Sequence, residues 1–104
     1  MRVKWSDSAM AQRKQIANYI SRYFGAKRKI LFLQEVRHTT QLLKNSPNLG
    51  SIDPLFDDFG IAYRSIIING LSKMVYYVKD DTIRIAAFWD TRREPVNQAA
   101  QVKE

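Results

Sequence analysis

The last third of the chain, residues 61–90, reads IAYRSIIINGLSKMVYYVKDDTIRIAAFWD and decides the fold. Polar and apolar residues alternate with a period of two in three segments, which is typical of β-strands: residues 61–68, 73–78 and 82–89. Asn69-Gly70 and Asp80-Asp81 separate these segments, and both dipeptides favour tight hairpin turns. The sequence therefore predicts a three-stranded antiparallel meander.

The residues before this meander predict a short strand and two helices. Arg2 to Trp5 alternates in polarity, and Ser6-Asp7-Ser8 then supplies side-chain oxygens that can cap a helix. Apolar residues recur at helical spacing up to Phe24, and Gly25 ends this helix. A second helix is expected from Ala26 to about Lys44. Because almost nothing joins the two helices, they should form an antiparallel hairpin.

The order of elements, β-α-α-β-β-β, predicts an α+β fold in which a helical hairpin packs on one face of an antiparallel sheet. Residues 45–60, NSPNLGSIDPLFDDFG, form a long connection with room for one short strand or turn. With 104 residues, the chain is expected to hold one domain over residues 1–95. A polar, flexible tail is expected over residues 96–104.

Composition restricts the possible functions. The formal net charge is +7, and residues 1–50 carry 10 Lys+Arg against 2 Asp+Glu. A basic small domain points to nucleic acid, the ribosome or an acidic protein partner, and a soluble protein that merely has a high pI is the alternative that composition leaves open. The chain has no cysteine and a single histidine, His38, so a zinc site or a cysteine nucleophile is not expected. No signal peptide or membrane span is predicted, which fits a cytoplasmic protein.

Alternation along the strands sorts their side chains into two faces. The face toward the helices is predicted to be apolar and to carry Met74, Tyr76, Val78, Ile83, Ile85, Ala87 and Trp89. The opposite face is predicted to mix cations with apolar side chains: Arg64, Lys73, Arg84, Ile66, Ile68, Val75, Tyr77 and Phe88. Because monomers seldom expose such a patch, we expect a partner surface here. The alternative is that the tail or the 45–60 connection covers the patch.

Arginine and lysine side chains are the strongest candidates for chemistry. Paired aspartates lie in predicted turns, where turn geometry explains them, and Lys27-Arg28-Lys29 fits a solvated helix face. Arg92-Arg93 follows the last strand in the stretch WDTRREP, beside the predicted cationic face. Guanidinium groups bind phosphate or carboxylate with fixed geometry. The set could hold an RNA backbone, stabilise a phosphoryl transition state or dock an acidic peptide.

Four segments resemble the RelE/ParE toxins of bacterial type II toxin–antitoxin systems: VKWSDSAMAQRKQIANYI (3–20), YRSIII (63–68), KMVYYV (73–78) and IRIAAFWDTRREP (83–95). The resemblance implies a small basic toxin bound by a cognate antitoxin protein and needing no metal or other cofactor. RelE-like members cleave mRNA on the ribosome, whereas ParE-like members inhibit DNA gyrase.

Carried over by position, the resemblance implies that Arg64, Lys73 and Arg93 would be the catalytic residues of a nuclease. Ile66 stands where nucleases tend to have a second lysine, and no tyrosine or histidine follows Arg93. These departures favour a ParE-like gyrase inhibitor, in which the predicted contact residues would bind the target or the antitoxin: Arg92, Arg93, Arg84, Ile66, Ile68, Val75, Tyr77 and Phe88. A ribosome-dependent mRNA endoribonuclease is the first alternative, and a non-toxic nucleic-acid-binding module is the second.

Overall fold

The computed structural model describes residues 1–56, 60–70 and 72–90. Its elements in chain order are β1 (Arg2–Trp5), α1 (Asp7–Phe24), α2 (Ala26–Asn45), β2 (Ser51–Ile52), the 3-10 helix η1 (Pro54–Phe56), β3 (Arg64–Ile68), β4 (Ser72–Lys79) and β5 (Thr82–Asp90). The predicted α+β order is confirmed, and the short strand in the 45–60 connection is β2. The predicted tail lies outside the described residues.

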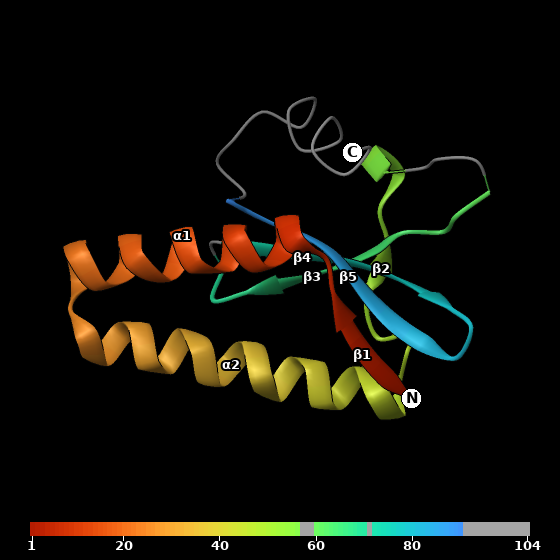
Figure 1. Ribbon diagram of the computed structural model, residues 1–104, viewed down its shortest axis with the longest axis horizontal. Helices are drawn as coiled ribbons and strands as arrows, with labels where there is room; N and C mark the ends of the chain where they lie inside the picture. Colours follow the sequence, from red (N-terminus) through yellow and green to blue (C-terminus); the bar gives the residue numbers. More distant parts are fainter. Residues whose placement is uncertain (57–59, 71, 91–104) are drawn as a thin grey trace.

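The strands form one five-stranded sheet in the order β1-β5-β4-β3-β2. β3, β4 and β5 make the predicted antiparallel meander, whereas β1 joins its edge in parallel with β5. The sheet is therefore mixed, and the first strand of the chain lies beside the last. Helices α1 and α2 run antiparallel and pack on one face of the sheet, and their connection projects beyond the strands (Figure 1).

The first turn of α1 is fixed directly to the sheet. The Ser6 hydroxyl oxygen accepts a hydrogen bond from Ala9 N–H at 3.0 Å and donates one to the Ala86 carbonyl at 2.9 Å. The Ser6 N–H donates to the Ile85 carbonyl at 3.0 Å. At the other end of α1, Gly25 takes a φ of +94°, a conformation that side chains disfavour. A serine cap and one glycine thus set both ends of α1.

Apolar side chains are buried on both faces of the sheet. The larger core lies between the helices and the sheet and contains Ala9, Ala17, Ile20, Phe32, Val36, Leu43, Ile68, Met74, Tyr76, Ile83, Ile85 and Phe88. A smaller core lies on the far face, where Phe56 and Tyr63 pack against Val75 and Ala87. The segment between β2 and β3 therefore covers part of the sheet face that was predicted to be open.

The β3–β4 connection closes one residue later than predicted. Asn69 and Gly70 take the positive φ of a hairpin turn, 60° and 69°, yet pairing resumes only at Ser72, opposite Ile68. A shift of one residue turns every side chain of a strand to the other face. The predicted face of β3 is therefore wrong, and three of its side chains lie on the helix side: Arg64, Ile66 and Ile68.

A β-bulge shifts the faces a second time, in the middle of β5. The register slips between Val75 and Tyr76, so that Ala86 is passed over in the β4–β5 ladder. One extra residue reverses the alternation beyond it. Phe88 therefore lies in the helix-side core, where we predicted the far face. By the same register, two residues predicted to face the helices belong to the far face: Ala87 and Trp89.

Candidate interaction surfaces

Lys73 of β4 is a buried cation that the protein pairs internally. Its Nζ lies 2.9 Å from Asp53 Oδ2 and 5.0 Å from the centre of the Phe56 ring. Only 9% of Lys73 is exposed. Asp53 is held in place because its Oδ1 accepts a hydrogen bond from Leu55 N–H at 3.0 Å. A desolvated lysine that already has a carboxylate partner is poorly placed to bind a phosphate from solution.

Arg64 of β3 holds the connection between α2 and β2. Its Nη1 donates to the Gly50 carbonyl at 2.7 Å and to the Asn48 carbonyl at 3.5 Å. Tyr76 holds the same connection, since its hydroxyl donates to the Pro47 carbonyl at 2.7 Å and accepts from Gly50 N–H at 2.9 Å. The contacts of Arg64 are therefore those of a structural residue.

The hydroxyl of Tyr76 is chemically perturbed by this setting. Burial raises the pKa of the Tyr76 phenol above its ordinary value of 10.0, and the Gly50 N–H and the Arg64 guanidinium partly oppose that rise. The connection approaches the ring closely. A Cβ added at Gly50 would lie 2.9 Å from both the Tyr76 ring and the Ser65 carbonyl. Glycine is required here because no side chain fits.

The structure separates the residues that were predicted to form a nuclease site. Lys73 lies on the far face of the sheet, whereas Arg64 lies on the helix side. Arg93, like Arg92, lies outside the described residues. The prediction that Arg64 and Lys73 share one face is therefore wrong, and its cause is the one-residue shift in the β3–β4 connection.

Most of the predicted apolar contact residues are buried by the protein's own chain. Ile68, Val75 and Phe88 are each at most 1% exposed, whereas Ile66 and Tyr77 are half-buried. The expectation of an open apolar patch is therefore wrong for these three residues. Ile68 and Phe88 lie under the helices, and Val75 lies under the segment between β2 and β3.

Arg84 and Tyr77 do lie on the far face of the sheet, as predicted, and they border a pocket of about 300 Å³. Tyr63 and Tyr77 line it with their ring centres 5.2 Å apart, and Lys4 contributes a second cation. The Nε of Arg84 is buried and makes no hydrogen bond within the part of the chain that the structure describes. Trp5 is a third aromatic residue in the lining, and Asp7 adds one carboxylate. The far-face pocket thus combines two cations with three aromatic side chains and one acidic side chain.

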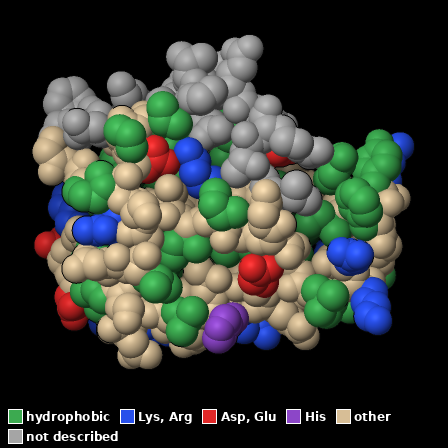
Figure 2. Space-filling model, turned by 180° about the vertical axis from the view of Figure 1, so that it is seen from behind, with side chains coloured by type: hydrophobic (Ala, Val, Ile, Leu, Met, Phe, Trp, Pro, Cys, Tyr) green, Lys and Arg blue, Asp and Glu red, His purple; other side chains and the backbone are tan. Residues whose placement is uncertain are grey.

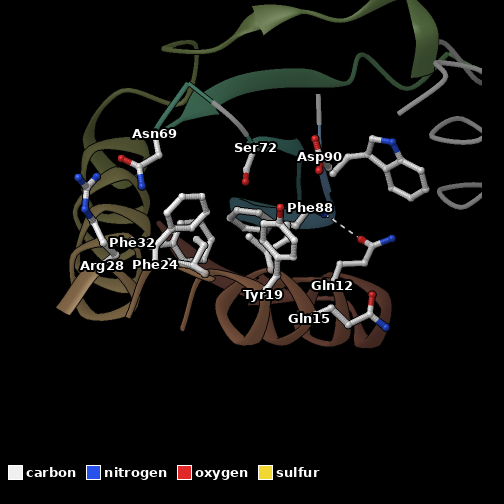
Figure 3. A pocket seen from close by; sticks show the side chains of 13 residues that line it. Gln12, Gln15, Tyr19, Phe24, Arg28, Phe32, Asn69, Ser72, Phe88 and Asp90 are labelled. Atoms are coloured by element: carbon white, nitrogen blue, oxygen red, sulfur yellow. Dashed lines mark hydrogen bonds between the residues drawn. The ribbon is translucent and has the colours of Figure 1, made fainter. Parts of the chain in front are cut away.

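A second pocket of about 300 Å³ opens where the helical hairpin meets the end of β5, and the sequence did not predict it. Its apolar lining comes from α1, α2 and β5: Ile16, Tyr19, Ile20, Phe24, Phe32 and Phe88. Gln12 of α1 also lines it, and its Oε1 accepts a hydrogen bond from Phe88 N–H at 2.9 Å (Figure 3). We call it the hairpin pocket.

Helical spacing did not reveal the hairpin pocket, because it counted Tyr19, Tyr23 and Phe24 among the regularly spaced apolar residues of the first helix and did not predict how exposed they are. In the structure Tyr23 is 62% exposed and Phe24 59% exposed. The available signal was the position of these aromatic residues in the last turns before Gly25, where the helical hairpin projects beyond the strands (Figure 1).

The fold and a match to a family model together place this chain among known proteins. Two helices pack on one face of a mixed five-stranded sheet (Figure 1), and this fold is similar to that of a solved ParDE structure. The family model for the ParE toxin of the type II toxin–antitoxin system, parDE, matches residues 3–95. The chain therefore belongs to the ParE toxin family.

A solved structure supports the same fold. The chromosomal ParDE TA system from P. aeruginosa is similar with a TM-score of 0.69 and 20% sequence identity, over 86% of this chain and 95% of that chain. No curated protein matches the chain in sequence. Among the described residues, no helix is long and apolar enough to cross a membrane.

Proposed function

We propose that this chain is the toxin of a type II toxin–antitoxin module, that it inhibits DNA gyrase, and that a cognate antitoxin neutralises it. The match to the ParE family model supports the toxin assignment. Gyrase is the target that the ParE-like branch implies. The observation that favours gyrase over mRNA is the internal ion pair between Lys73 and Asp53.

Cleavage of mRNA by a cationic site needs several donors aimed at one phosphate. Lys73 is buried against Asp53, and Arg64 donates to backbone carbonyls on the other side of the sheet. No tyrosine or histidine follows Arg93. These three facts weaken the alternative of a ribosome-dependent endoribonuclease.

The contacts to the target belong, in this proposal, to the far face of the sheet at the end of the meander. Arg84 and Tyr77 border the far-face pocket, and Arg92 and Arg93 follow β5 in the sequence. Arginine recognises carboxylates through two parallel hydrogen bonds, so acidic residues of the target are the expected counterpart.

The test compares supercoiling and translation with one preparation of the purified chain. We expect the chain to block supercoiling of relaxed plasmid by gyrase while cell-free translation continues. Arg93→Ala and Arg84→Ala should each weaken the block. Arg37→Ala removes an exposed arginine from α2 and is the matched control, which should inhibit as the unchanged chain does.

Other outcomes would contradict the proposal in different ways. Cleavage of mRNA only on translating ribosomes would favour the endoribonuclease, and loss of that cleavage in Arg93→Ala would assign it to this chain. Normal bacterial growth after induction of soluble, folded chain would exclude both toxins. Salt-sensitive binding to nucleic acid would then favour the non-toxic binding module.

A further inference from the structure

The exposed end of the helical hairpin combines aromatic rings with cations. Tyr19 and Tyr23 lie with ring centres 4.8 Å apart, and the Arg22 guanidinium lies 5.7 Å from the centre of the Tyr23 ring. Phe24 and Arg28 border the hairpin pocket. We call the following residues the hairpin-tip surface: Tyr19, Arg22, Tyr23, Phe24, Lys27 and Arg28. All six are exposed.

The charge of this surface has one sign. Residues 8–34, which make up most of the hairpin, hold six Lys+Arg and no Asp or Glu. The end of the helical hairpin lies at the right in Figure 2, where hydrophobic and cationic side chains lie side by side without an acidic side chain among them. Such a field attracts an anionic partner and repels a second copy of this chain.

The hairpin pocket restricts the shape of that partner. Its floor is formed by buried apolar side chains, Ile20, Phe32 and Phe88. Arg28 lies at one side of the pocket and Asp90 at another (Figure 3). A bulky apolar side chain fits this hollow, whereas a flat bilayer cannot enter it. A phosphate backbone would satisfy the cations but leave the apolar floor in water.

We propose that the hairpin-tip surface binds an acidic segment of a protein partner, which inserts a large apolar side chain into the hairpin pocket and places carboxylates near Arg28 and Arg22. This proposal adds to the proposed function the chemistry of the segment that the partner presents. It rests on the proposed function in one respect, namely that the partner is a protein. Buried apolar anchors within a charged rim are the usual source of affinity at such interfaces.

A displayed library of random peptides, selected on the full folded chain, tests this directly. Selected peptides should carry at least one large apolar residue and a net negative charge. A synthetic peptide from the selection should bind roughly tenfold more weakly to Arg28→Glu and to Phe24→Asp, a loss of about 1.4 kcal/mol each. Its affinity should also fall with added salt.

Arg37→Glu is the matched control, because it makes the same charge change on α2 at an exposed position outside the hairpin-tip surface. It should bind the peptide as the unchanged chain does, and circular dichroism should show that every variant is folded. The proposal is overturned by a selection that yields no binders, or only basic or wholly polar ones. Binding that ignores Arg28→Glu and Phe24→Asp overturns it too.

Duplex DNA and vesicles of anionic phospholipid separate the competing partners. Tighter binding of either one than of the selected peptide would overturn the proposal in favour of nucleic acid or membrane. The result is also separable from the proposed function. A chain that arrests growth but selects no acidic peptide contradicts only the surface assigned here, whereas a harmless chain that selects such peptides contradicts only the toxin assignment.

Discussion

Lys73 of β4 and Asp53, the first residue of the segment between β2 and β3, lose most of their hydration when they pair. Their side chains are 11% and 6% exposed. Desolvation of two charges offsets much of their attraction, so the pair adds little net stability compared with apolar side chains of similar size. Each of the two charges nevertheless needs the other, because a single charge left in this buried place would have lost its hydration without gaining an ion-pair partner.

Removing one partner should therefore be more harmful than removing both. We expect Lys73→Met to lower the free energy of unfolding by about 3–5 kcal/mol, because Asp53 keeps its charge in a buried place. The double variant Lys73→Met, Asp53→Asn, which removes both charges but keeps an acceptor for Leu55 N–H, should recover most of that loss. Urea denaturation at neutral pH measures both, with Lys79→Met, exposed on the same strand, as the control. Equal losses in the single and double variants would contradict this account.

Tyr76 makes stability depend on pH above the ordinary phenol pKa. Because burial raises its folded pKa above 10.0, the folded state keeps a proton that the unfolded state releases. The stabilisation is therefore complete below pH 10.0 and is lost as pH rises from 10.0 through the folded pKa.

The variant Tyr76→Phe should have a shallower fall in unfolding free energy over this alkaline range. It should also be less stable by about 1–3 kcal/mol at neutral pH, since Gly50 N–H loses its buried acceptor. Urea denaturation at several pH values measures both effects. An identical alkaline slope in the two proteins would refute the role given to the Tyr76 phenol.

At the scale of elements, Ser6 joins the start of α1 to the bulged part of β5. Its hydroxyl caps the helix and donates to the carbonyl of Ala86, the residue that the β4–β5 ladder passes over. The bulge therefore has a visible structural use. It presents a free carbonyl at the place where the helix must begin.

Ser6→Ala should lower the free energy of unfolding by about 1–2 kcal/mol, since it removes the helix cap and the bond to Ala86. Ser6→Asp keeps a capping acceptor but has no hydroxyl donor, so its loss should be intermediate. Ser8→Ala serves as the control within the first turn of α1. Thermal denaturation of the four proteins gives the ranking, and a loss in Ser6→Asp as large as that in Ser6→Ala would contradict the capping role.

The sequence predicted the helices and strands better than it predicted which face of the sheet each strand residue occupies. Periodicity and turn residues predicted both helices, and the predicted end of the second helix, Lys44, lies one residue before the observed end at Asn45. The turn predicted at Asp80-Asp81 joins β4 to β5 as expected. Face assignment failed at Arg64 and at Phe88. A one-residue change in a connection and a bulge each reverse every side chain beyond them, and neither leaves a signal in local alternation.

At the scale of the whole molecule, β4 is shared by both cores. Met74 and Tyr76 lie in the helix-side core, while Val75 lies in the far-face core with Phe56 and Tyr63. Neither core can lose its packing without exposing one side of the same strand. The two cores should therefore unfold together.

We expect a single cooperative transition, with the same midpoint by far-ultraviolet circular dichroism and by aromatic fluorescence. Phe32→Ala in the helix-side core and Phe56→Ala in the far-face core should each lower the free energy of unfolding by about 3–5 kcal/mol. In each variant the midpoints measured by the two signals should move together. Tyr23→Ala on the exposed hairpin tip should leave the midpoint nearly unchanged. Two separate transitions in either core variant would show that the cores are independent.

The parallel pairing of β1 with β5 has a consequence for synthesis of the protein. Ser6 and Ala86, which join these regions, are 80 residues apart, and α1 also rests on β5 through Gln12 and Phe88. A growing chain leaves the ribosome from its N-terminus, so α1 can pack on α2 early, but β1 and the side of α1 that faces the sheet must wait for the last strand. If translation stops before Thr82, β5 is never made, so β1 has no strand to pair with and α1 lacks its contacts with β5. An incomplete product of this gene should therefore be a harmless one.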